Sequence, residues 1–144
     1  MDRDRKMRYI FGPVPSRRLG ISLGVDLISY KTCTFNCIYC QLGRTTNQTL
    51  KRNEYVKAQD ILKELRQFLK SPNSPSGTSS PLGTRGELLT PNYITLSGSG
   101  EPTLNSKIGE IISRIKKMTS IPVAVLTNGS LLYRKEVRDN LKKA

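Results

Sequence analysis

The chain has 144 residues, of which 24 are Lys or Arg and 11 are Asp or Glu, so its formal net charge is +13. This length is typical of one domain. No apolar run reaches the roughly 18 residues that predict a membrane span, and the charged N-terminus lacks the apolar stretch of a secretory signal. We therefore expect a cytoplasmic protein that binds no membrane. The basic charge is open to two interpretations, solvated helix faces or a nucleic-acid-binding surface.

Hydrophobic periodicity predicts three strands, each followed by a helix. Alternating apolar residues predict a strand over 22–28, and short apolar runs predict strands over 93–97 and 122–127. Amphipathic patterns predict three helices, over 58–70, from Asn105 or Ser106 to Met118, and from about Tyr133 onward. This order predicts an α/β fold with a parallel sheet and crossover helices.

Two further segments stand apart from this pattern. Residues 1–21 contain two prolines beside two arginines and are predicted to be a rigid lead-in to the first strand. Residues 71–92 are rich in Pro, Ser and Gly, so we expect an insertion that is disordered in part.

The three cysteines, Cys33, Cys37 and Cys40, have the spacing C-x3-C-x2-C. Packing as small apolar residues would not explain why they cluster, and a disulfide would leave one thiol over. A closed zinc site takes four ligands, and because the chain has no His and no fourth Cys, it would need a carboxylate or a second chain. The remaining interpretation is an iron–sulfur cluster with one iron open to an outside ligand.

Two other unusual loops follow the second and third predicted strands. They are "GSGEPTL" (98–104) and "TNGS" (127–130). Because ligands bind at the carboxyl ends of strands in parallel sheets, we expect these loops and the cysteines to meet at one edge.

The three segments resemble a known superfamily. The cysteine motif, with Tyr39 before its last cysteine, resembles the signature of the radical S-adenosylmethionine (SAM) superfamily. Residues 97–104 resemble that superfamily's Gly-Gly-Glu-Pro segment, and residues 126–132 resemble its third-strand segment. The run from Gly12 to Gly43 resembles a branch broadly related to the tRNA wybutosine-forming enzymes, mostly of undefined substrate.

The resemblance implies a 4Fe–4S cluster held by Cys33, Cys37 and Cys40, with SAM on the open iron. It implies that Tyr39 lies beside the adenine and that Gly100 and Glu101 meet the SAM amino group. Ser99 stands where the superfamily has its first glycine. The remaining implied SAM-binding residues are Ser99, Pro102, Asn128 and Ser130, although "NG" at 128–129 is also a plain turn signal.

The implied function is that of a radical SAM enzyme, an iron–sulfur oxidoreductase or transferase that cleaves SAM to a 5′-deoxyadenosyl radical. The resemblance and the charge together suggest an RNA substrate such as tRNA, and a flavodoxin or ferredoxin would supply the electron. The alternative is a non-catalytic module that holds a metal or cluster and binds RNA.

The superfamily's core resembles a partial (β/α)6 TIM-like barrel, which by scaling from the eight-unit barrel takes roughly 190 residues. Residues 22–144 supply three βα units. We therefore expect the N-terminal half of such a barrel, a fragment whose C-terminal half is missing and which is inactive if truncated.

Overall fold

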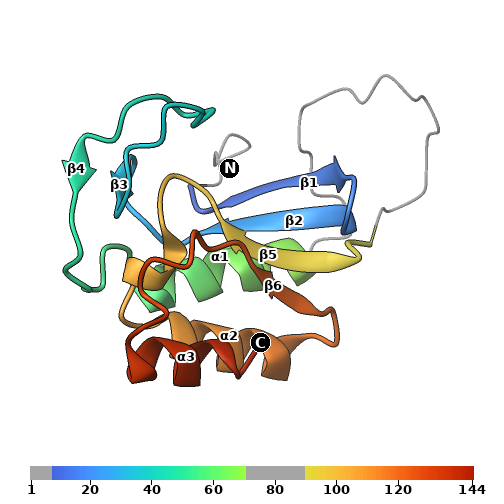
Figure 1. The fold of residues 1–144 in the computed structure, drawn as a ribbon. Coiled ribbons are helices and arrows are strands. Elements are labelled where there is room, and N and C mark those ends of the chain that lie inside the picture. Colours follow the sequence, from blue (N-terminus) through green and yellow to red (C-terminus); the bar gives the residue numbers. More distant parts are fainter. Residues whose placement is uncertain (1–7, 71–89) are drawn as a thin grey trace.

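The computed structural model describes residues 8–70 and 90–144, which form a four-stranded sheet with helices packed on one side (Figure 1). The strand order is β1-β2-β5-β6, in which β2, β5 and β6 are parallel and β1 is antiparallel to β2. A second small sheet pairs β3 with β4 in parallel. The elements are β1 (Ile10–Ser16), β2 (Gly20–Asp26), β3 (Thr32–Cys33), β4 (Asn47–Gln48), α1 (Ala58–Lys70), β5 (Tyr93–Ser97), the 3₁₀ helix η1 (Pro102–Leu104), α2 (Ile108–Met118), β6 (Val123–Val125) and α3 (Lys135–Leu141).

The α/β class and the alternation of parallel strands with helices are confirmed. The bounds of α1 and β5 match the predicted 58–70 and 93–97. The first predicted strand is shifted, since β2 covers 20–26 and not 22–28. The predicted half of a barrel is not seen as such. The described strands form an open sheet with β1 and β6 at its edges, and this sheet shows no barrel closure.

The predicted lead-in contains a strand that periodicity did not reveal. β1 pairs with β2, and the aromatic ring of Phe11 lies on Gly24, where an added Cβ would be 2.0 Å from the ring. The carboxylate of Glu64 on α1 accepts hydrogen bonds from the backbone of Tyr9 and Ile10, at 2.9 and 3.0 Å. β1 is therefore held by partners distant in sequence, which a local pattern cannot show.

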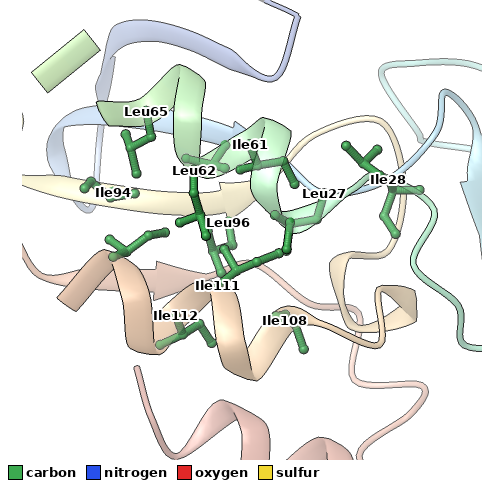
Figure 2. Close-up of a cluster of buried hydrophobic side chains, with 14 of the residues drawn as sticks. Leu27, Ile28, Ile61, Leu62, Leu65, Ile94, Leu96, Ile108, Ile111 and Ile112 are labelled. Atoms are coloured by element: carbon green, nitrogen blue, oxygen red, sulfur yellow. The ribbon is translucent and has the colours of Figure 1, made fainter. Parts of the chain in front are cut away.

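The hydrophobic core lies between the sheet and the helices (Figure 2). Ile61 and Leu65 are one helical turn apart on α1 and face Ile94 and Leu96 of β5, all four fully buried. Burying a Leu or Ile side chain contributes about 1.5–3 kcal/mol, so these contacts stabilise the packing of α1 against the sheet. The core residues of α2 are Ile108, Ile111, Ile112 and Ile115.

The predicted insertion 71–92 lies mostly outside the described residues, but Asn92 belongs to the fold. Its backbone donates to Ile21 O at 2.7 Å, and its Oδ1 accepts from Ile21 N at 2.8 Å. None of the helices in the described part of the chain has the length and apolarity to cross a bilayer.

Candidate thiol site at the carboxyl edge of the sheet

Three loops meet at the end of the sheet where β2, β5 and β6 have their carboxyl ends (Figure 1). We call residues 33–43 the cysteine loop, residues 98–105 the Glu101 loop and residues 126–132 the Asn128 loop. The predicted convergence is present, because hydrogen bonds join the Asn128 loop to each of the other two.

The cysteine loop carries three free thiols. Cys33 ends β3, and the backbone of Cys40 donates to Cys37 O at 3.2 Å to close a turn. Each cysteine is half-buried, whereas the residues flanking Cys37 and Cys40 are exposed. The three thiols are therefore less exposed than the residues next to Cys37 and Cys40.

The sulfur atoms do not converge in this conformation. Within residues 8–70 and 90–144, no three Cys, Asp, Glu or His side chains lie close enough together to hold a metal ion. The donor chemistry of three thiols in one loop fits a thiolate-bound metal centre, but the loop would have to draw its sulfurs closer to bind one.

Two of the sulfurs already have nitrogen donors. Lys31 Nζ donates to Cys40 Sγ at 3.4 Å, and Asn128 Nδ2 lies 3.9 Å from Cys33 Sγ. The pKa of the Cys40 thiol is below its ordinary value, chiefly because the backbone of Leu42 hydrogen-bonds to it. Lys31 lowers this pKa further, while desolvation opposes both effects. The fold therefore favours the thiolate of Cys40.

Tyr39, the implied neighbour of an adenine, lies on the surface of the loop and is 84% exposed. The pKa of its hydroxyl is raised, chiefly by a hydrogen bond with Cys37. Its neighbour Ile38 is fully exposed. Both side chains are therefore open to solvent.

Thr34 joins the cysteine loop to the Asn128 loop. Its buried hydroxyl accepts a hydrogen bond from Asn128 Nδ2 at 2.9 Å and shares one with Ser130 Oγ at 2.6 Å. Asn128 and Ser130 are therefore brought to the cysteines as predicted, but their polar groups are used to hold the two loops together.

The carboxylate of Glu101 is buried and fully used by the chain itself. Oε1 accepts from Thr103 Oγ1 at 2.6 Å and from Thr127 Oγ1 at 2.5 Å, and Oε2 accepts from Asn128 N at 2.8 Å. Glu101 also caps η1, which starts at the buried Pro102. In this conformation Glu101 connects the loops that follow β5 and β6, and its carboxylate is shielded from solvent.

Gly100 and Ser99 are also occupied by internal contacts. A Cβ on Gly100 would lie 1.8 Å from Thr32 O, so its lack of a side chain lets the Glu101 loop touch the strand that ends at Cys33. The hydroxyl of Ser99 donates to Asp26 Oδ2, as does its backbone N–H. A serine can stand where the superfamily has glycine only if its φ is negative. Among the described non-glycine residues only Lys31 has a positive φ, so Ser99 meets this condition.

Sequence reasoning missed four residues that shape this edge: Asp26, Lys31, Thr34 and Thr127. The sequence could have indicated two of them, Asp26 at the end of β2 and Thr127 just after β6. Polar residues at the carboxyl end of a parallel strand lie at the edge where ligands bind. Nothing in the local sequence distinguishes Lys31 from the many solvated basic residues.

The fold and this edge define an α/β protein with a thiol-bearing loop at the carboxyl ends of a short parallel sheet. The chain is similar to a UPF0026 protein from Methanocaldococcus jannaschii, at 36% identity over 135 residues, or 94% of this chain and 37% of the relative. It is similar to a UPF0026 protein from Synechocystis, at 43% identity over 136 residues, or 94% of this chain and 44% of the relative. It is also 43% identical over 136 residues to a protein named GTPase Obg from Brachyspira hyodysenteriae, covering 94% of this chain and 18% of that protein.

The chain thus spans less than half the length of these relatives. No family model matches it. No solved structure matches it either.

These findings correct the identification made from the motifs. Two of these relatives are described as UPF0026 proteins, a name that states no activity, and nothing in the comparisons supports a radical SAM enzyme. The predictions of superfamily, of an oxidoreductase or transferase and of SAM cleavage are therefore wrong. The thiols also lack the convergence that a preformed metal site would show. Binding of SAM, of RNA or of an electron-transfer partner stays a prediction, because neither the fold nor the relatives test it.

Proposed function

We propose that this chain binds a metal centre through Cys33, Cys37 and Cys40, and that the centre is an iron–sulfur cluster. The observation that carries the proposal is that three free, half-buried thiols stand in one short loop. The loop lies at the edge where parallel sheets bind ligands. The proposal concerns binding and names no reaction.

The loop can adjust without disturbing the fold. Residues 35–43 bury no apolar side chain, and Phe35, Ile38 and Leu42 are exposed. The turn from Cys37 to Cys40 and the bond from Gly43 N to Cys40 O, at 3.0 Å, hold it locally. The ends of the loop are held in place, because Thr34 is buried and β3, before the loop, pairs with β4, after it. Metal binding would therefore reshape the tip and leave the anchors in place.

The chemistry of the three ligands limits which kind of metal centre the chain can bind. Three thiolates without histidine suit iron–sulfur clusters, and a cluster with three cysteine ligands leaves one iron for a further ligand. Free thiols persist in a reducing compartment, so this proposal places the protein in the cytoplasm.

The test is anaerobic reconstitution of the chain with iron and sulfide, followed by gel filtration and metal analysis. We expect a brown protein that retains about four irons per chain. The variant Cys37→Ser should retain little iron, while the control Ser106→Ala, an exposed serine outside the three loops, should match the wild type.

Two outcomes contradict the proposal. One is a colourless protein whose three thiols all still react with a thiol reagent. The other is one tightly held zinc with no retained sulfide, which would indicate a mononuclear site. Titration of the reconstituted protein with SAM then asks whether the predicted ligand changes the spectrum of the cluster.

A further inference from the structure

Lys31 is a buried lysine whose ammonium group donates a hydrogen bond to the sulfur of Cys40. The residue is only 3% exposed, although lysines are almost never buried without a partner. Among the described residues, the hydrogen-bond partner of Nζ is Cys40 Sγ, at 3.4 Å, and no carboxylate oxygen lies within 4.0 Å of it. A buried ammonium in this position favours an anion at the sulfur.

The backbone of Lys31 is held in a conformation that is unfavourable for a residue with a side chain. Its φ is +58°, and it is the one non-glycine residue with positive φ in the described part of the chain. Its N–H donates to Ser99 O at 2.8 Å, and its carbonyl accepts from Thr46 N and Asn47 N, both at 3.2 Å. Glycine or asparagine would adopt this conformation more easily. Strain of this kind is concentrated where a side chain has a specific task.

We propose that Lys31 is a positioning residue of the thiolate site, whose ammonium holds the Cys40 sulfur and offsets the negative charge of the bound centre. This inference rests on the proposed function and adds an electrostatic partner to it. A cluster held by three thiolates is anionic, and each added electron makes it more so. A fixed positive charge at one sulfur therefore favours binding and favours the reduced state.

The test compares reconstituted wild-type protein with Lys31→Met, which keeps the apolar stem and removes the charge. We expect Lys31→Met to lose iron to a chelator roughly 10–100-fold more readily, the range usual for a partner of a metal ligand. We also expect its cluster to have a more negative midpoint potential in a redox titration. Lys31→Arg, which keeps the charge, should restore the potential toward that of the wild type.

The matched control is Lys63→Met on the exposed face of α1, which changes the net charge equally. If Lys31→Met and Lys63→Met share the same potential and iron retention while the wild type holds a cluster, the role of Lys31 is refuted and the proposed function stands. If the wild type holds no cluster, both are refuted. Should Lys31→Met fail to fold by circular dichroism, Lys31→Asn replaces it, because asparagine suits the backbone at this position.

Discussion

The Glu101 loop and the cysteine loop lie at the same edge of the sheet but are built in opposite ways. In the Glu101 loop, Glu101, Thr103 and Asn105 are buried, and their polar atoms are satisfied by the chain. In the cysteine loop most side chains are exposed, and the side-chain donors to the thiols are Lys31 for Cys40 and Asn128 for Cys33. One loop holds the edge of the sheet together, and the other offers groups that the fold itself does not need.

This difference matters because the motifs alone make both loops look equally functional. A glutamate after a strand can bind a ligand or can join two loops. Here the partners of Glu101 show that it joins the loops after β5 and β6. Four tests probe this division between the loops, in order of decreasing expected effect on stability.

Replacing Glu101 should have the largest effect on folding. Glu101→Ala leaves the buried hydroxyl of Thr103, the hydroxyl of Thr127 and the backbone N–H of Asn128 without their acceptor. Because each buried unsatisfied group costs about 1–3 kcal/mol, we expect a loss of about 3 kcal/mol in the free energy of unfolding, measured by urea denaturation.

The control is Glu110→Ala, since Glu110 is 40% exposed and pairs with Arg114 on the surface of α2. Loss of such a pair changes stability by about 0.5 kcal/mol or less. Equal effects of the two variants would show that Glu101 is not needed to connect the two loops.

The second test uses the same substitution in both loops. Gly100→Ala places a Cβ 1.8 Å from Thr32 O, whereas Gly43→Ala meets no atom within 4 Å but has an unfavourable φ of +82°. We expect Gly100→Ala to cost about 2–3 kcal/mol through overpacking and Gly43→Ala about 1 kcal/mol through backbone strain. Thermal unfolding of both variants measures the difference, and the reverse order would contradict the contrast between the loops.

The third substitution breaks the connection between the loops. Asn128→Ala removes the amide that donates to Thr34 Oγ1 and accepts from Ser130 N, but keeps the backbone bond to Glu101. A lost hydrogen bond in a partly exposed site contributes about 1 kcal/mol. Faster amide exchange in the cysteine loop, with unchanged exchange in α1, is the expected readout, whereas a uniform change throughout the chain would argue against a local link.

The smallest effect on stability is expected from the thiols. Cys37→Ser changes one sulfur on an exposed loop, so the metal-free variant should unfold within about 0.5 kcal/mol of the wild type. After reconstitution the same variant should lose its iron. A large loss of stability without metal would show that the cysteines serve the fold.

Local patterns predicted much of the frame. The apolar spacing of Ile61, Leu62 and Leu65 predicted α1 because a helix needs one apolar face, and the run at 93–97 predicted β5. They missed β1, whose pairing depends on Phe11 reaching Gly24 and on a carboxylate 54 residues away. They also led to a superfamily that the relatives do not support, because short motifs report residue types and spacing, not partners.

The sequence by itself determined that three parallel strands alternate with three helices, and which loops would meet. Both follow from periodicity and from the rule that parallel strands end at one edge. Only the tertiary structure decided what the residues in those loops do. The carboxylate of Glu101 is bound by residues 26 and 27 positions away, and the link from Thr34 to Ser130 spans 96. Burial and hydrogen bonding are set by such distant neighbours. They therefore decide that Glu101 is a buried structural residue, whereas the thiol of Cys37 is free to bind a ligand.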